Sequence, residues 1–162
     1  MSGRAAMEHS LFTEPPEDFH PTVEVASCYC ECWDRLLFVR RHPNKPQGNT
    51  WGLPGGKLEG HENPKMAVVR EIREEVGLDI DDDALQAIGQ FYCRLPHIDY
   101  VFHVFRKSFQ AMPKVDLALD EHLESRWVTM HEALALPLIA GGAQLLHYYG
   151  EKWMASRSCP AH

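Results

Sequence analysis

Three glutamates lie close together near the middle of the chain, at Glu71, Glu74 and Glu75. An α-helix advances by about 100° per residue, so Glu74 and Glu75 fall within about 60° of Glu71, one on each side. Like charges at these spacings repel one another, and the helix dipole disfavours negative charge near a helix C-terminus. Grouped carboxylate oxygens are ligands that Mg²⁺ and Mn²⁺ prefer. The spacing therefore favours a divalent-cation site, with a solvated acidic face as the alternative interpretation.

The helix that carries these acids is predicted to run from Pro64 to Val76. Asn63 suits the N-cap, Pro64 suits the first helical position, and Gly77 ends the helix. The apolar side chains lie on the roughly opposite side of this helix: Met66, Val69, Ile72 and Val76. We therefore expect the helix to pack on a sheet through that side and to present its acids on the other.

Further elements are expected before and after this helix. Patterns typical of strands cover residues 22–33, 35–41, 85–95, 98–109 and 126–130, and helical patterns cover 131–135 and 137–149. Tight turns are expected at 33–34 and 96–97, and a loop over 42–50. In the second strand, Leu36 and Phe38 face one way while Leu37 and Val39 face the other, which is typical of a strand buried on both faces. This mixture predicts an α/β fold with a mixed sheet covered by helices.

The chain of 162 residues is long enough for one domain with a hydrophobic core. We expect a loosely ordered arm over residues 1–20, a single domain over 21–155 and a tail over 156–162. The formal charge of -7, from 16 basic and 23 acidic residues, argues against binding to duplex DNA. No apolar run approaches the roughly 18 residues of a membrane span, and the N-terminus does not resemble a signal peptide. We therefore expect a cytoplasmic protein without a membrane partner.

The cysteines favour the same compartment. They are Cys28, Cys30, Cys32, Cys93 and Cys159. Their number is odd, and the first three alternate along one expected strand, where neighbours on the same face are poorly placed to pair. We expect reduced, partly buried thiols, with a Cys-x-Cys-x-Cys metal site as an alternative that the close spacing disfavours.

The segment from Gly56 to Leu78 resembles the Nudix box. That pattern is Gly, five residues, Glu, seven residues, Arg-Glu, an aliphatic residue, any residue, Glu-Glu, any residue, Gly and an aliphatic residue. Every fixed position is filled here, by Gly56, Glu62, Arg70, Glu71, Ile72, Glu74, Glu75, Gly77 and Leu78. The flanking strands also follow the family's order, so the resemblance covers about residues 23–149. It implies a Nudix-type α/β/α sandwich.

The resemblance also implies metal-dependent hydrolysis of a nucleoside diphosphate linked to a further group. The implied metal ligands, or neighbours of the metal, are Glu71, Glu74, Glu75 and the carbonyl of Gly56. The implied metal is Mg²⁺, or alternatively Mn²⁺. Arg70 would orient a glutamate, and Glu62 would help to fix the loop and the helix start.

Several members of the family supply another carboxylate from a loop just before a strand that carries a Trp. Glu121 lies in such a position before Trp127 and is the expected further metal ligand, with Glu124 as the alternative. The resemblance leaves the general base open between Glu71 and this outside carboxylate. A solvated loop acid is the other interpretation of Glu121 and Glu124.

Several residues outside the box are candidates for contacts with a substrate. Trp51, Tyr92 and Phe102 could stack on a base, although aromatic residues on strands more often belong to a core. Arg40 and Arg41 end a strand near the expected site and could meet a phosphate. The chain has 10 histidines, and none shows a ligand spacing.

The expected substrate is a small nucleotide. A nucleoside triphosphate, native or damaged, is the first choice, with a nucleoside monophosphate as product, and ADP-ribose or a nucleotide sugar is the second. A non-catalytic nucleotide-binding module is disfavoured because no box glutamate is lost. An enzyme acting on capped RNA is disfavoured because the chain has no basic run. Dimers are common in the family, so a homodimer is an open alternative to a monomer.

Overall fold

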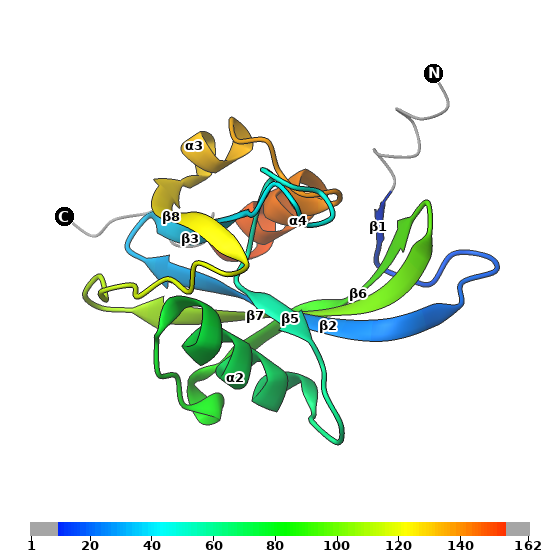
Figure 1. The fold of residues 1–162 in the computed structure, drawn as a ribbon, viewed down its shortest axis with the longest axis horizontal. Helices are drawn as coiled ribbons and strands as arrows, with labels where there is room; N and C mark the ends of the chain where they lie inside the picture. Colours follow the sequence, from blue (N-terminus) through cyan, green and yellow to red (C-terminus); the bar gives the residue numbers. More distant parts are fainter. Residues whose placement is uncertain (1–9, 155–162) are drawn as a thin grey trace.

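The computed structural model describes residues 10–154. Its strands are β1 (Leu11–Phe12), β2 (Pro21–Cys32), β3 (Arg35–Arg41), β4 (Trp51–Gly52), β5 (Gly55–Lys57), β6 (Gln86–Leu95), β7 (Ile98–Phe109) and β8 (His122–Thr129). Its helices are α2 (Pro64–Val76), α3 (Met130–Leu134) and α4 (Gly142–Tyr149), with a 3-10 turn η1 (Asp82–Ala84) and a π-helical turn η2 (Gly150–Met154). Helix α2 covers one face of the sheet, and α3 and α4 cover the other (Figure 1). The predicted α/β/α sandwich with a mixed sheet is confirmed.

The sheet is organised around β2. Its main path follows the order β1-β6-β7-β2-β3-β4, with β5 paired to β2 and β8 paired to β3. Strands β2 and β7 are parallel, and the other named pairs are antiparallel. The short β5 places Gly55 opposite Ser27 and Gly56 opposite Ala26. This pairing brings the start of the Nudix-box segment onto the middle of β2, beside α2.

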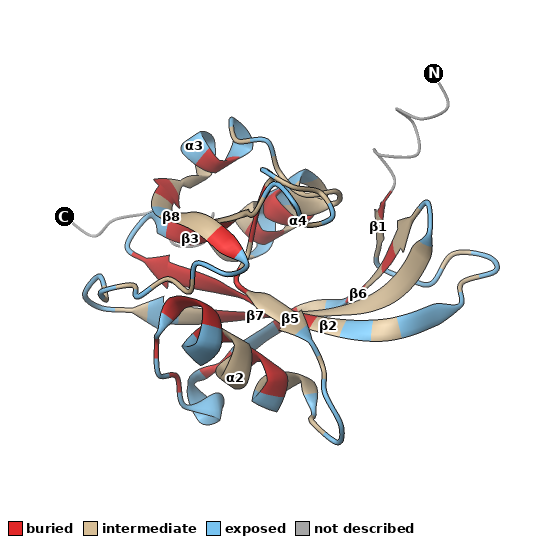
Figure 2. Cartoon of the chain, in the orientation of Figure 1, coloured by how far each residue is buried: buried red, intermediate tan, exposed pale blue. Residues whose placement is uncertain are grey.

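Strand β3 divides its side chains between two cores, as its sequence predicts. Leu37 and Val39 pack in the core under α2, whereas Leu36 and Phe38 pack in the core under α4. Figure 2 shows buried residues along the side of α2 that faces the sheet. Within residues 10–154, no helix has the length and apolar character needed to cross a membrane.

The limits of α2 are confirmed, and three of the four predicted apolar residues, Val69, Ile72 and Val76, pack in or against the core. The Met66 N–H donates to Asn63 Oδ1 at 2.9 Å, and Gly77 caps the other end with φ 69°. Met66 is the exception, at 50% exposed, and the buried face also includes Ala67, Val68 and Glu75. The prediction that the acids face away from the sheet holds for Glu74, whose side chain is 59% exposed, and is wrong for Glu71 and Glu75. These two acids lie against β5, where Gly56 leaves space for the Glu71 carboxylate.

The predicted helix over 137–149 is shorter than expected. Trp51 N–H donates to the Pro137 carbonyl at 2.8 Å, and Ile139 N–H donates to the Trp51 carbonyl at 2.9 Å. These bonds hold residues 137–139 extended along β4, and Gly141, at φ 82°, precedes α4. Strand β8 is longer than predicted and begins at His122.

The ends of the chain are described only in part. Residues 11–12 pair with β6, so the arm expected over 1–20 contributes a short strand to the sheet. Residues 1–9 and 155–162, including the expected tail and Cys159, lie outside the described part. Within that part, Cys28, Cys30, Cys32 and Cys93 are buried free thiols, as predicted.

A buried polar network fixes α4 to the sheet. Arg106 Nη2 donates to Glu31 Oε1, and the hydroxyl of Tyr149 donates to the same oxygen at 3.0 Å. Arg106 Nη1 also donates to Gln86 Oε1 at 2.7 Å. The ring of Tyr29 stacks on that of Tyr149, with centroids 4.0 Å apart. The C-terminal end of α4 is therefore held by hydrogen bonds as well as by packing.

We expect Asn63→Ala to lower the free energy of unfolding by about 1 kcal/mol, because the Met66 N–H loses its acceptor. Urea denaturation of the full chain measures this change. Asn63→Asp keeps a side-chain acceptor and is the control. Equal stability of Asn63→Ala and the wild type would show that this cap does not stabilise α2.

Candidate active site

The acids of α2 meet the sheet where β5 crosses β2. Gly55 N–H donates to Glu75 Oε1 at 2.9 Å. At Gly56, an added Cβ would lie 2.6 Å from Cδ of Glu71. Gly55 has φ 154°, and a Cβ there would lie 2.3 Å from the Ala26 carbonyl oxygen. Glycine at position 55 therefore allows β5 to approach β2, and glycine at position 56 allows the Glu71 carboxylate to approach β5.

The three helix acids differ in their exposure. Glu75 is 5% exposed, the Glu71 side chain is 14% exposed, and that of Glu74 is 59% exposed. Burial raises the pKa of Glu75 to about 9, and the nearby Glu71 and Glu121 contribute, while the hydrogen bond from Gly55 opposes the shift. In the absence of a cation, Glu75 therefore keeps its proton at neutral pH.

Arg70 links the helix acids to the loop before the helix. Its Nε donates to Glu62 Oε2 at 2.6 Å, and its Nη2 donates to Glu62 Oε1 at 3.0 Å. Its Nη1 lies 2.8 Å from Glu71 Oε1 and 3.2 Å from Glu74 Oε1. The hydrogen bonds from Arg70 lower the pKa of Glu62. Glu62 also accepts the Glu59 N–H at 2.9 Å, so this acid fixes both the loop and Arg70.

Glu121 lies beside the helix acids although it is distant in sequence. One ligand atom each from Glu75, Glu121 and His122 lie within 4.8 Å of one another. The alternative acid, Glu124, is instead held by Arg40 at 3.3 Å and Arg126 at 2.8 Å. The structure therefore brings Glu121, and not Glu124, to the cluster.

His122 is the residue of this cluster that the sequence interpretation missed. It is 5% exposed, and burial lowers its pKa, an effect that the neighbouring Glu121 opposes. None of the 10 histidines shows a ligand spacing. His122 is adjacent to Glu121 in the sequence, but the direction of its side chain depends on a strand geometry that the sequence does not reveal.

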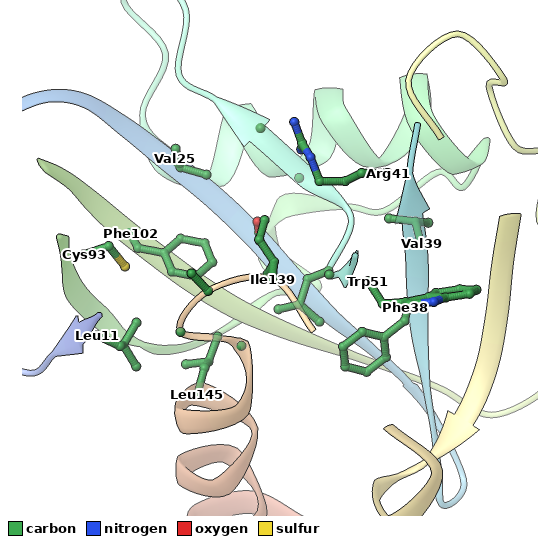
Figure 3. Close-up of a pocket in the computed structure, with 18 of the residues that line it drawn as sticks. Leu11, Val25, Phe38, Val39, Arg41, Trp51, Cys93, Phe102, Ile139 and Leu145 are labelled. Atoms are coloured by element: carbon green, nitrogen blue, oxygen red, sulfur yellow. The ribbon is translucent and has the colours of Figure 1, made fainter. Parts of the chain in front are cut away.

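An apolar pocket opens beside the cluster (Figure 3). Its apolar walls include Val25, Phe38, Trp51, Phe102 and Leu145. Its polar lining includes Ser27, Arg41, Lys57, Tyr100 and His122. Gly55 and Gly56 line the pocket as well as the carboxylate site, so the two are adjacent.

The candidate substrate contacts separate into two groups. Trp51, Phe102 and Arg41 line the pocket. Tyr92 instead packs edge-on against Phe19, with ring centroids 5.5 Å apart. Arg40 is engaged by Glu124 and by Asn49, whose Oδ1 lies 2.9 Å from Arg40 Nη1.

Comparison with known proteins agrees with this geometry. The family model described as "NUDIX domain" matches residues 20–149. The chain belongs to the Nudix hydrolase family.

Two curated relatives and one solved structure illustrate the membership. The "CTP pyrophosphohydrolase" of Escherichia coli (strain K12) is 31% identical over 140 residues, which cover 84% of this chain and 94% of that protein. A "Putative 8-oxo-dGTP diphosphatase 3" of Mycobacterium tuberculosis is 31% identical over 118 residues, or 71% of this chain. The match covers 50% of that mycobacterial relative. The crystal structure of a MutT protein from Methanosarcina mazei Go1 superimposes with a TM-score of 0.69 at 25% identity, covering 85% of this chain and 96% of that one.

The residues of this Nudix hydrolase fit the divalent metal that the family generally needs. Carboxylate and carbonyl oxygens are ligands of hard divalent cations, and Glu71, Glu75, Glu121 and Gly56 would supply them. Their mutual repulsion and the raised pKa of Glu75 are consistent with a cation that compensates these charges when bound.

We expect Gly56→Ala to weaken Mn²⁺ binding by about tenfold or more, because the new Cβ displaces the Glu71 carboxylate. The atoms in conflict are the end of a flexible side chain, so the variant should fold. Calorimetric titration of the full chain measures the affinity. Gly60→Asn is the matched control, because a Cβ at Gly60 meets nothing within 4 Å and Asn tolerates its φ of 52°. Unchanged affinity in Gly56→Ala would contradict the placement of Glu71.

We expect Glu75→Gln to stabilise the metal-free protein at pH 8, by on the order of 2 kcal/mol. The pKa of Glu75 is about 9 in the folded protein against an ordinary value of 4.5. Between these values the folded protein holds a proton that the unfolded chain has lost, so the wild type loses stability as the pH rises. Gln has no such proton and still accepts the Gly55 N–H.

Urea denaturation with a chelator at pH 4.5 and pH 8 measures this difference. The advantage of Glu75→Gln should shrink at the lower pH, and Glu151→Gln, an exposed substitution, should show no such dependence. A variant that is less stable than the wild type at pH 8 would contradict the raised pKa.

Proposed function

We propose that this Nudix hydrolase converts a nucleoside triphosphate, native or oxidatively damaged, to a nucleoside monophosphate and pyrophosphate. The observation that carries the proposal is the adjacency of the carboxylate cluster and the aromatic-lined pocket across Gly55 and Gly56. Such a pair can hold a base and a phosphate chain at the same time. The names of the two curated relatives, which refer to CTP and to 8-oxo-dGTP, support this substrate class.

Each part of the site has a role in this proposal. A bound Mg²⁺ supplies Lewis acidity at the phosphate oxygens and lowers the pKa of a bound water. Glu71, Glu75 and the Gly56 carbonyl would hold that ion. Glu121 is exposed and adjacent, so it is placed to accept the proton of the attacking water, with Glu71 as the alternative base.

The chain's own cations and aromatic rings would position the substrate. Arg41 and Lys57 line the pocket and would attract the phosphates. Trp51 and Phe102 would exclude water around the base. Arg70 stays engaged with Glu62 and would hold Glu71 in place.

The direct test is a panel of nucleoside triphosphates, oxidised deoxynucleoside triphosphates, ADP-ribose and nucleotide sugars, each with Mg²⁺ and with a chelator. We expect turnover of a triphosphate to monophosphate and pyrophosphate, and its loss with the chelator. Preferred turnover of ADP-ribose would overturn the proposal of a triphosphate substrate and favour ADP-ribose instead. Nucleotide binding without turnover of any compound would favour a binding module and overturn the enzyme proposal.

We expect Glu71→Gln and Glu75→Gln to reduce kcat by about 100-fold or more while the fold is retained, because each removes charge that the metal needs. Steady-state kinetics and far-UV circular dichroism measure the two properties. Glu151→Gln, which is exposed and distant in sequence, is the control. Near-normal activity of Glu75→Gln would contradict its role in metal binding.

We also propose a cytoplasmic location, which the buried free thiols of Cys28, Cys30, Cys32 and Cys93 support, since oxidising compartments favour disulfides. A homodimer stays a prediction, and analytical ultracentrifugation of the full chain would test it.

A further inference from the structure

A histidine joins the two acids at the centre of the site. His122 begins β8, directly after Glu121, and is 5% exposed. Its Nδ1 is buried and has no hydrogen-bond partner among the described residues. A buried polar atom without a partner costs about 1–3 kcal/mol of stability. A ligand bound to the imidazole ring of His122 would remove this cost.

The local strand geometry turns His122 toward the acids. In the pairing of β3 with β8, Arg40 lies opposite Glu124, whereas Arg41 lies opposite His122. One step along β3 therefore corresponds to two steps along β8, and Leu123 is the extra residue of a β-bulge. Bulges beside active sites commonly re-aim a side chain in this way.

The alternation of side chains shows what the bulge changes. Val39 packs in the core under α2, and Arg41, two residues further along β3, continues that face. In a regular ladder, Leu123 would lie opposite Arg41 and His122 would turn to the α4 side. Because of the bulge, His122 lies instead on the α2 side, where Glu75 is buried.

The distances within the cluster suit direct coordination. With bonds of about 2.0–2.2 Å, two ligands on opposite sides of one cation lie about 4.4 Å apart. The ligand atoms of Glu75, Glu121 and His122 lie within 4.8 Å of one another, so small rotations would let one ion contact all three.

We propose that His122 provides a ring-nitrogen ligand to the divalent cation held by Glu75 and Glu121. The proposal deepens the proposed function, because it concerns the metal of the same site. Imidazole favours transition-metal ions over Mg²⁺, whereas an all-oxygen site does not discriminate in this way. The nitrogen therefore biases this site toward Mn²⁺ or Co²⁺ relative to an equivalent site made of carboxylates alone.

Electron spin-echo envelope modulation of the full chain loaded with Mn²⁺ tests the proposal, because it detects a nitrogen nucleus bound to the ion. We expect ¹⁴N modulation in the wild type and its loss in His122→Gln.

His42→Gln is the matched control. The His42 N–H donates to the Glu121 carbonyl at 2.9 Å and its Nδ1 is also buried without a partner, yet His42 is not in the cluster. Modulation that persists in His122→Gln, or that disappears in His42→Gln instead, would overturn the proposal.

Two further measurements complete the test. Wild-type protein grown with ¹⁵N-histidine should show a changed modulation frequency, a result that holds even if His122→Gln does not fold. In a folded His122→Gln protein, Co²⁺ affinity should fall by about tenfold or more while Mg²⁺ affinity changes by less than about threefold. Equal losses for both ions would overturn the assigned preference.

Measurements on the same samples distinguish a wrong assignment of His122 as a ligand from a wrong proposed function. Mn²⁺ binding and Mg²⁺-dependent turnover without any ¹⁴N modulation would overturn only the role of His122. A wild-type protein that binds no Mn²⁺ and turns over no nucleotide would overturn both.

Discussion

The repulsion among the buried Glu75, the largely buried Glu71 and the exposed Glu121 beside them is the interaction on which the site depends. Carboxylates brought this close cannot all carry their charge unless a cation or a proton compensates it. The metal-free protein keeps a proton on Glu75, where burial is deepest. In the proposed function, a bound metal would replace that proton and compensate the charges of these acids.

Those neighbours act through geometry more than through charge. Gly55 and Gly56 let the helix acids reach the backbone of β5, and Arg70 is held in one orientation by two hydrogen bonds to Glu62. In this orientation, Arg70 Nη1 donates to Glu71 Oε1 at 2.8 Å. The carboxylate site can lie next to Arg70 because the guanidinium of Arg70 is already hydrogen-bonded to Glu62.

Local rules predicted much of this structure from the sequence. The limits of α2 follow from Asn63 and Gly77, whose effects extend over a few residues. The division of β3 between two cores follows from simple alternation in a strand, with Leu37 and Phe38 on opposite faces. The Nudix box predicted the acids of α2 because their spacing is local to one helix. The position of Glu121 in the loop before Trp127 predicted that this acid lies near them.

The errors concern features that depend on distant partners. Glu71 and Glu75 were expected on the side of α2 away from the sheet, because the helix sequence does not show that β5 passes beside them. Residues 137–139 have a helical pattern, yet the backbone of Trp51 holds them extended. The register shift at Leu123 has no visible mark in the sequence, so the direction of His122 could not be predicted.

The network around Arg106 has a consequence for how the chain matures during synthesis. Glu31 and Tyr149, which share a hydrogen bond, are separated by 118 positions. A ribosome releases the strand with Glu31 long before the helix with Tyr149, and chains are made at about 5–20 residues per second. For several seconds, a nascent chain can therefore have α2 without the α4 wall of the pocket. Leu145 lines that pocket only once α4 has docked, so the pocket is completed after the acids of α2 have emerged.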